Sequence, residues 1–350
     1  MFSALRRTLI RGKSWEYWHP LALYLPIVPY ALYLAARARA LTFFAAANPA
    51  IPAGGLFYED KYQVLKLFPA AYTPLTVFVS IGTTADEAME MLEAAGIGFP
   101  LIAKPNYGDR GRAVEKLYDA AMLTDYLRTN TVSDTLLQEY VEYPVEVGVL
   151  YHRTPNEAHG HITSLTLKEF LSVTGDGKRS LLALITDYPR AFLQLEALRR
   201  TTLDLTRVPK VGERVQLGHI GNHSRGTIFL NGNAHIDAAL VAVFDRLHEQ
   251  TEGLYFGRYD IRCRSLDDLR RGEHFRILEY NGVKAEPTHI YEPNASLAVA
   301  YVTMFRQWRT IFRIAEANRR SGVYYPPTQA VLTELQQQRR YMRLHREHAV

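Results

Sequence analysis

Residues 255–282, YFGRYDIRCRSLDDLRRGEHFRILEYNG, carry the pattern that decides the fold. Two apolar runs, 255–264 and 274–280, are joined by the polar connection SLDDLRRGE. Runs of this length, rich in Ile, Tyr and Phe and bounded by polar or Gly-containing segments, are typical of strands. We therefore expect a pair of neighbouring strands here.

Polar side chains interrupt both strands at positions that can bring them together. Glu279 and Asn281 share a face because side chains alternate along a strand, and Asp260 on the partner strand can converge with them. Three oxygen ligands without Cys or His favour a hard cation, Mg²⁺ in a nucleotide setting, over zinc. Arg258 points to the same side as Asp260 and could stabilise charge on a transferring phosphoryl group. The alternative is that these residues form salt bridges on the surface of a sheet. That alternative does not explain why Glu and Asn occupy alternate positions beside an apolar strand.

Upstream, the segment 99–111, FPLIAKPNYGDRG, ends an apolar strand at Lys104 and continues into a glycine-containing turn. A lysine followed by such a loop suits phosphate, because the ammonium is a point charge and the loop amides donate hydrogen bonds. The alternative is a solvated hairpin with basic residues, since Gly and Asp are common in turns.

Between these motifs lies LQEYVEYPVEVGV, residues 137–149, in which one strand leads through a short linker into another. Two lobes can be hinged at such a linker. Its backbone groups could contact an adenine edge, and a following carboxylate could hold ribose hydroxyls. The alternative is two ordinary strands with surface glutamates.

A glycine-rich stretch, GHIGNHSRG at 218–226, predicts a loop. His219 and His223 are spaced as zinc ligands on a helix would be, but the glycines argue against a helix, and a third ligand is not evident. Arg225 and His223 could instead contact the substrate or the γ-phosphate, because an arginine fork suits phosphate and carboxylate. A purely structural loop is the third alternative.

Strands and helices mix along the chain without a steady βαβ rhythm, so we expect an α+β protein with antiparallel sheets. Further strands are expected at 41–47, 76–81, 99–104, 136–140, 146–152, 161–170 and 181–186. Helices are expected at 85–95, 114–127, 192–201, 234–252, 294–317 and 332–348.

The composition is that of an ordinary globular protein, which excludes global disorder and low-complexity classes. The net charge of +5 divides into +5 over residues 1–40, +4 over 319–350 and −4 between them. Nucleic-acid binders usually spread basic residues over the folded body, so we expect no nucleic-acid partner. The single cysteine, Cys263, excludes an intrachain disulfide and fits a reducing compartment.

Residues 17–36, YWHPLALYLPIVPYALYLAA, carry no formal charge and are flanked by basic residues. Three prolines interrupt the helix that a membrane span would need. The segment could pack on the protein's own core. It could also lie at a membrane surface, with its aromatic residues at headgroup depth and Arg and Lys facing anionic lipid. A membrane span is the least favoured of the three.

The ordered set FPLIAKPNYGDRG, LQEYVEYPVEVGV, GRYDIR and ILEYNG resembles the ATP-grasp superfamily. The resemblance is closest to its carboxylate–amine/thiol ligase branch, which includes the D-alanine–D-alanine ligase and cyanophycin synthetase types, and it covers roughly residues 59–295. It implies two α/β lobes that clamp ATP, preceded here by a hydrophobic helical segment and followed by a basic helix.

The resemblance also implies roles for individual residues. Arg258 looks like the arginine that stabilises the acyl-phosphate and tetrahedral intermediates, and Lys178 or Lys168 is similar to a lysine that reaches the γ-phosphate. The nucleotide-binding set would be Lys66, Lys104, the loop with Gly108, Arg110 and Gly111, the hinge Glu139, Tyr140 and Val141, and Glu146 at the ribose. The ligands of two Mg²⁺ ions would be Asp260, Glu279 and Asn281.

The expected organisation has five parts: the hydrophobic segment 1–40, a short region 41–75, an N-lobe 76–142, a C-lobe 143–318 and a basic tail helix 319–350. The expected function is a Mg-ATP-dependent carboxylate–amine ligase that acts through an acyl phosphate. The alternatives are a kinase-like phosphotransferase and a non-catalytic nucleotide-binding protein at a membrane. We expect small carboxylate and amine substrates, a homodimer, and a cytoplasmic location with peripheral membrane contact. The loop after Asn281 departs from the ligase pattern, so the substrates do not transfer.

Overall fold

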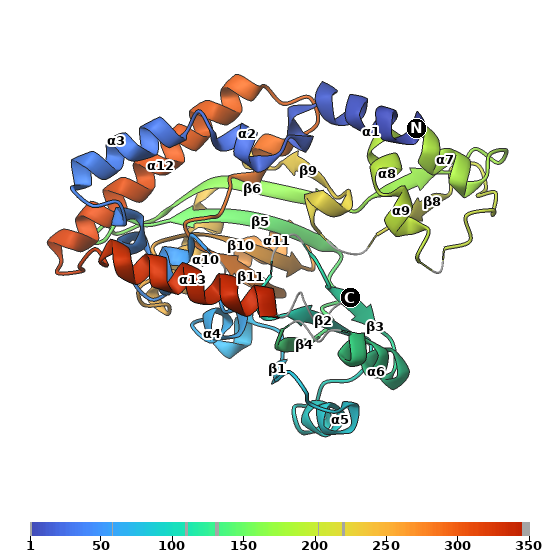
Figure 1. Cartoon of the computed structure of the whole chain (residues 1–350), viewed down its shortest axis with the longest axis horizontal. Coiled ribbons are helices and arrows are strands. Elements are labelled where there is room, and N and C mark those ends of the chain that lie inside the picture. Colours follow the sequence, from blue (N-terminus) through green and yellow to red (C-terminus); the bar gives the residue numbers. More distant parts are fainter. Residues whose placement is uncertain are drawn as a thin grey trace.

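The computed structural model describes residues 2–57, 59–108, 111–129, 133–201, 203–218 and 221–344. Within them the chain forms two larger antiparallel sheets and a small two-stranded one (Figure 1). The α+β class with antiparallel sheets, predicted from the sequence, is confirmed.

The first sheet has the strand order β1-β4-β2-β3. Its strands are β1 (Thr76–Val79), β2 (Leu101–Pro105), β3 (Glu115–Leu117) and β4 (Thr135–Glu139). Helices α5 (Ala85–Ala94) and α6 (Ala120–Thr129) pack against it through a core that includes Leu92, Leu101 and Leu123. A capping box at Thr84 and Glu87 begins α5, as the Thr and Glu spacing predicts.

The second sheet has the order β11-β10-β5-β6-β9. Its strands are β5 (Val145–His152), β6 (His161–Glu169), β9 (Ile228–Asn231), β10 (Phe256–Cys263) and β11 (Phe275–Asn281). One face of this sheet packs on helices α10 (Ala238–Glu249) and α11 (Leu266–Arg271). That face carries Val147, Val149, Tyr259 and Ile261, all at most 1% exposed. The opposite face is apolar at Leu150 and Phe256, where it packs on the core that includes residues of α3 (Val28–Ala38) and α12 (Leu297–Arg320), and polar beyond them, where it builds the candidate site.

The small sheet pairs β7 (Ser172–Thr174) with β8 (Arg214–Gln216). It packs with α7 (Leu181–Asp187), α8 (Pro189–Leu193) and α9 (Leu195–Leu198) around a separate apolar core. Helix α1 (Phe2–Lys13) lies against this subdomain, where Arg7 pairs with Glu196 (Nη2–Oε1, 3.1 Å) (Figure 1).

The two ends of the chain run along the second sheet. Helices α2 (Pro20–Tyr24) and α3 (Val28–Ala38) lie along α12 (Leu297–Arg320), and α13 (Thr328–Leu344) follows it (Figure 1). Leu23 and Ile27 pack on α12 in one apolar core, and Leu34 contributes to another. No helix among the described residues is both long enough and apolar enough to cross a membrane. The N-terminal segment is therefore packed on the protein's own core along one side.

Most expected elements are confirmed, and three are wrong. Residues 41–47 do not form a strand: Phe43–Ala47 is a buried 3₁₀-helix packed on α12, where Asn318 Nδ2 donates to Ala46 O (2.7 Å). Residues 181–186 form the helix α7, because Ser180 Oγ caps it by accepting from Ala183 N (3.3 Å). The segment 114–127 is first a strand, β3, and becomes helical only at α6.

The remaining short elements are α4 (Lys61–Leu65) and the 3₁₀-helices at Trp15–Tyr17, Pro52–Gly55, Ala70–Tyr72, His223–Arg225, Asn233–His235 and Thr288–Tyr291.

Candidate functional site

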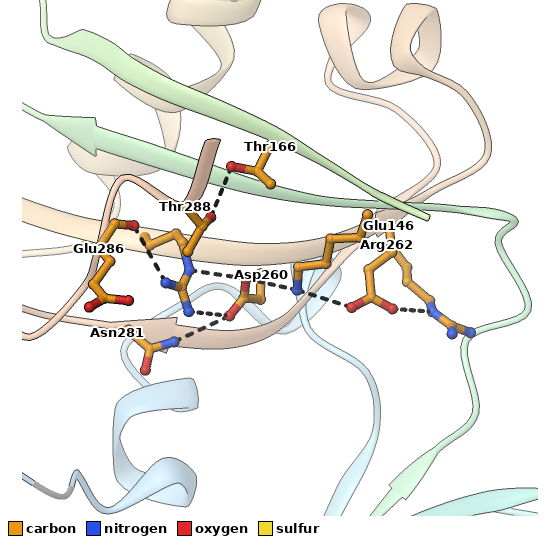
Figure 2. Close-up of polar contacts among 9 residues, drawn as sticks. Glu146, Thr166, Asp260, Arg262, Asn281, Glu286 and Thr288 are labelled. Carbon is orange, nitrogen blue, oxygen red and sulfur yellow. Dashed lines mark hydrogen bonds and ion pairs between the residues drawn. The ribbon is translucent and has the colours of Figure 1, made fainter. Parts of the chain in front are cut away.

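The polar face of the second sheet holds a buried network of charges (Figure 2). Arg258, Asp260 and Arg262 alternate along β10 and so point to this one face. Room for them comes from Gly148 on β5, which pairs with Asp260. A Cβ on Gly148 would lie 3.3 Å from Arg258 Cδ and 3.4 Å from Asp260 Oδ1, closer than side chains normally approach.

One row of this face crosses three strands. Arg262 on β10, Glu146 on β5 and Lys168 on β6 are direct cross-strand neighbours. Glu146 accepts from Lys168 Nζ at Oε1 (3.0 Å) and from Arg262 Nε at Oε2 (3.2 Å). All three side chains are at most 8% exposed, so these are buried ion pairs that solvent screens little.

Asp260 is the centre of the network. Its Oδ1 lies 3.0 Å from Lys168 Nζ, while Arg258 donates to both carboxylate oxygens (3.2 and 3.1 Å). Asn281 Nδ2 donates to Oδ2 (3.3 Å). Burial opposes the charged form, but Arg258 and Lys168 outweigh it and lower the pKa of Asp260 to about 2. Asp260 is therefore a carboxylate at any physiological pH.

A β-bulge brings β11 into the network. Asp260 pairs with Glu279, but the next pair is Ile261 with Ile277, so Leu278 is the extra residue. This shift puts Ile277 in the apolar core and Glu279 on the polar face. The predicted shared face of Glu279 and Asn281 is confirmed, and Asp260 lies directly opposite Glu279.

Lys104, at the end of β2, joins the two sheets. Its Nζ donates to Gln138 Oε1 (2.9 Å) in the first sheet and to Leu278 O (3.1 Å) at the bulge. Burial lowers the pKa of Lys104 to about 8, although Glu279 and Asp260 partly restore it. The predicted phosphate lysine thus lies beside the charged face of β10 and β11.

The glycine loop after β2 is held by a lysine that the sequence did not single out. Lys61, the first residue of α4, donates from Nζ to Gly108 O (2.6 Å). Its charge also opposes the protonation of Lys104. Lys66, the lysine the resemblance selected, is exposed, and its Nζ lies 4.3 Å from the centre of the Tyr62 ring. Arg110 lies outside the described residues.

The hinge segment follows β4. Glu139 Oε2 accepts from Leu75 N (3.2 Å), and Val141 O accepts from Arg262 Nη1 (2.8 Å). The ring of Tyr140 lies under Lys116, with Nζ 3.4 Å from the ring centre. Arg262 therefore ties the hinge backbone to Glu146, whose ribose role stays a prediction.

The glycine-rich loop reaches across to the first sheet. Arg225 Nη2 donates to Gly111 O (3.1 Å), so the loop touches the predicted phosphate loop. The backbone of Gly221 lies against Glu146: an added Cβ would be 1.7 Å from Glu146 Oε1, so only glycine fits. His223 turns away and pairs with Glu16 (Nε2–Oε2, 2.9 Å). His219 lies outside the described residues.

The two candidate γ-phosphate lysines lie in different places. Lys168 is part of the buried network, within 3.0 Å of both Glu146 and Asp260. Lys178 is exposed in the turn after β7, where its backbone N–H donates to Asp176 Oδ1 (2.9 Å). The structure brings Lys168 to the site and does not bring Lys178 there.

The N-terminal segment closes one end of the network. Tyr24, from α2, donates from its hydroxyl to Glu286 Oε1, and Glu286 O accepts from Arg258 Nη1 (3.5 Å). Lys284 pairs instead with Glu59 (Nζ–Oε2, 2.7 Å). Neither the Tyr24 contact nor the row through Glu146 has a local sequence signal, because each joins residues far apart in the chain.

The donor set fits a hard divalent cation. Asp260, Glu279 and Asn281 offer only oxygen ligands of the type that Mg²⁺ takes in proteins. Glu279 is half-buried and forms no ion pair within 4.0 Å among the described residues, which leaves its carboxylate available. Another acidic group, Asp268 with Glu273 and His274, lies elsewhere, and Arg264 already donates to both Asp268 oxygens.

Comparison with known proteins was made at three levels, and no family model matches the chain. Among solved structures, the chain is similar to D-alanine–D-alanine ligase from Bacillus anthracis, with a TM-score of 0.44 and 14% identity over 77% of this chain and 71% of that one. It is also similar to the VanG D-Ala:D-Ser ligase from Enterococcus faecalis, with a TM-score of 0.43 and 13% identity over 75% of this chain and 62% of that one. These structures are ATP-grasp ligases.

The bifunctional glutathione synthetase from Pasteurella multocida aligns with 71% of this chain and 36% of its own, with a TM-score of 0.38 and 13% identity. Among curated proteins, the carbamoyl phosphate synthase large chain from Beutenbergia cavernae is 29% identical over 102 residues, 26% of this chain. The chain spans only 9% of that relative's length. The solved structures to which the chain is similar are ligases of the kind that the sequence motifs predicted.

Proposed function

We propose that the chain is a Mg-ATP-dependent ligase that joins a carboxylate to an amine through an acyl phosphate. The observation that carries the proposal is the buried charge cluster where the two sheets meet. Four cations (Lys104, Lys168, Arg258 and Arg262) face three carboxylates (Glu146, Asp260 and Glu279). Such a concentration of cations in a buried setting suits an anionic ligand such as a nucleotide phosphate.

The chain's own residues would bind and orient the phosphates. Lys104 would supply a positive charge at the end of β2, and the glycine loop, whose Gly108 O accepts from Lys61 Nζ, would supply backbone amides. Asp260, Glu279 and Asn281 would hold Mg²⁺, which when bound would neutralise part of the phosphate charge. Catalysis of this kind is mainly positioning and electrostatic stabilisation.

Two group transfers would follow. A carboxylate oxygen of the substrate attacks the γ-phosphorus, the bond from the γ-phosphorus to the β,γ-bridging oxygen breaks, and ADP leaves. An amine nitrogen then attacks the carbonyl carbon, the carbon–oxygen bond to phosphate breaks, and the amine gives up a proton. Arg258, bidentate on Asp260 and in contact with the loop after β11, is placed to stabilise the charge that develops in both steps.

The test is ADP release by the full chain on a panel of carboxylates and amines, with mass analysis of the product. A ligase releases ADP and phosphate only when both substrates are present, and its product has a new amide bond. A phosphorylated product formed with one substrate would indicate the kinase-like alternative. ATP binding without turnover on the whole panel would favour the non-catalytic alternative.

We also infer that the N-terminal segment lies at a membrane surface on its outer side. Its inner side is packed, but Leu21, Leu25, Val28 and Leu32, which lie on α2, the turn after it and α3, are 46–77% exposed. Val299 and Val302 on α12 are exposed as well. Exposed apolar stripes beside basic residues are typical of interfacial helices.

Vesicle flotation tests this inference. The full chain is expected to float with vesicles that contain anionic lipid, and a variant with Leu21, Leu25, Val28 and Leu32 changed to Ser is expected to float markedly less. The outward positions leave the inner core unchanged, so the variant should fold. Equal flotation of both proteins would contradict the inference. A cytoplasmic location and a homodimer stay predictions from the sequence.

A further inference from the structure

A cavity of about 430 Å³ lies at the far end of α3, away from the charge cluster. Its walls come from the end of α3, the end of α12 and the segment that leads into α13. The polar side chains that line it are Arg37, Arg39, Thr42, Arg319, Tyr325 and Thr328. Its volume is in the range of small-ligand sites.

The charge of this cavity is one-sided. Three arginines line it, and no Asp or Glu is among its lining residues. Within the described part of the chain, none of Arg37, Arg39 and Arg319 forms an ion pair with a carboxylate. The adjacent Arg320, outside the cavity, does pair with Glu316 (Nη2–Oε2, 3.6 Å). Among the described residues, the three guanidiniums therefore have no carboxylate within ion-pair distance, and the nearby Glu316, whose charge acts on Tyr325, is paired with Arg320.

The guanidiniums are placed against aromatic rings and keep their hydrogen-bond donors available. The Cζ of Arg37 lies 5.2 Å from the centre of the Phe312 ring, and that of Arg319 lies 4.7 Å from the Tyr325 ring. A guanidinium is a planar fork of N–H donors, and that geometry matches phosphate.

Two further features point to a missing partner. Arg39 caps α3 in the left-handed conformation, with φ 54° and ψ 30°, where glycine is usual. The backbone thus adopts a disfavoured geometry at a residue whose side chain lines the cavity. Helix α13 also begins at Thr328 on the cavity wall, and its dipole favours an anion there.

We propose that this cavity binds a phosphate group, carried either by a soluble phosphate ester or by a lipid headgroup. The proposal does not depend on the ligase activity, because no residue of the charge cluster lines the cavity. The lipid source has a structural argument of its own. The exposed apolar residues Val28, Leu32 and Tyr33 precede the cavity on α3, and Leu41, 59% exposed, follows it.

Binding to the full chain is measured with four probes: inorganic phosphate, glycerol 3-phosphate, and phosphatidylcholine vesicles with and without phosphatidic acid. The test variants are Arg39→Gly, which suits the left-handed backbone and should fold, and Arg37→Gln. Each is expected to weaken binding about tenfold, the usual effect of losing a charge-assisted hydrogen bond. The matched controls are Arg320→Gln, next to the cavity, and Arg128→Gln, an exposed arginine that pairs with Asp125 and lines neither the cavity nor the charge cluster.

Phosphate or glycerol phosphate binding that falls in the two cavity variants and not in the controls identifies a soluble ligand. Binding only to vesicles with phosphatidic acid, with the same pattern of variants, identifies a lipid headgroup. Absence of binding to every probe would overturn the proposal. If Arg320→Gln weakened binding as much as the cavity variants do, the proposal would also be overturned. Binding would then depend on the general positive charge of this surface and not on the cavity.

Discussion

Glu16 and Asp260 are two buried carboxylates that are each held by two basic side chains, and of this pair only Asp260 belongs to the candidate site. Glu16, in the N-terminal segment, pairs with Arg190 and His223 and is 8% exposed at its side chain. Asp260 pairs with Arg258 and Lys168 and is 11% exposed. In both groups the neighbouring cations outweigh burial and lower the carboxyl pKa.

The difference lies in what surrounds each carboxylate. Around Glu16 the remaining contacts are structural: Arg190 Nη1 donates to Thr227 O (3.3 Å), and the His223 ring packs on Phe229 and Tyr291. Around Asp260 lie an unpaired carboxylate, Glu279, an amide, Asn281, and the lysine that bridges the two sheets. A buried ion pair by itself therefore indicates little about function. An additional ligand without a partner is the more informative feature.

The largest effect expected is on turnover in Glu279→Gln. Glu279 has no ion pair within 4.0 Å among the described residues, so its loss should cost little stability, but it would remove a charged Mg²⁺ ligand. ADP release is expected to fall about 10³-fold, the scale for loss of one electrostatic stabiliser. Steady-state kinetics with a thermal melt of the same sample measures both. Turnover close to that of the unchanged chain would remove Glu279 from the site.

Glu16→Gln is the matched variant in the other cluster. The substitution removes the negative charge that pairs with the buried Arg190, and an unpaired buried charge is strongly destabilising. The free energy of unfolding should therefore fall by about 3 kcal/mol. Urea unfolding measures this. Turnover per folded molecule should stay near the unchanged value, because within the described part of the chain Glu16 pairs with Ser14, Arg190 and His223 and with no residue of the charge cluster. If Glu16→Gln instead lost turnover without losing stability, the distinction between the two clusters would fail.

The pKa of Lys104, lowered by burial to about 8, makes nucleotide affinity sensitive to pH. Below this value the ammonium is charged and attracts phosphate. As the pH rises through about 8 the charge is lost, and the KM for ATP should rise about tenfold. Affinity for ATP should therefore fall with rising pH, whereas the stability of the fold should increase. The lysine has a pKa near 10.5 in the unfolded chain, so above pH 8 the unfolded chain binds more protons than the folded one. The free energy of unfolding therefore rises with pH through this group.

The difference between the unchanged chain and Lys104→Gln isolates both effects. The variant should have a higher KM for ATP at pH 7. Between pH 7 and 9 its KM and its free energy of unfolding should rise much less than those of the unchanged chain. An identical pH profile in the two proteins would show that Lys104 does not contact the nucleotide.

The parts of the site that the sequence predicted are those fixed by local spacing. Asp260, Glu279 and Asn281 lie on neighbouring strands joined by a short connection, so alternation along each strand was enough to bring them together. Lys104 was predicted because it ends an apolar strand. The resemblance gave the order of the motifs, and the structure added the register that aligns Glu146 with Lys168 and Arg262.

What the sequence missed depends on tertiary packing. The apolar runs at 41–47 and 181–186 were predicted as strands because a short apolar run does not distinguish a buried strand from a buried helix. Phe43–Ala47 is helical because it packs on α12, and 181–187 because Ser180 caps it. The contact between Tyr24 and Glu286 joins residues 262 positions apart, so no local pattern could show it.

The choice between Lys61 and Lys66 is the last and smallest test of this comparison. The resemblance selected Lys66, but this residue, just after α4, is exposed and its ammonium lies over the Tyr62 ring. Lys61 lies one turn earlier, and its ammonium holds Gly108 O at 2.6 Å. Lys61→Gln should raise the KM for ATP several-fold, about the effect of one hydrogen bond to a charged group, whereas Lys66→Gln should leave it unchanged. Measured in parallel, the reverse result would mean that the loop moves toward Lys66 when nucleotide binds.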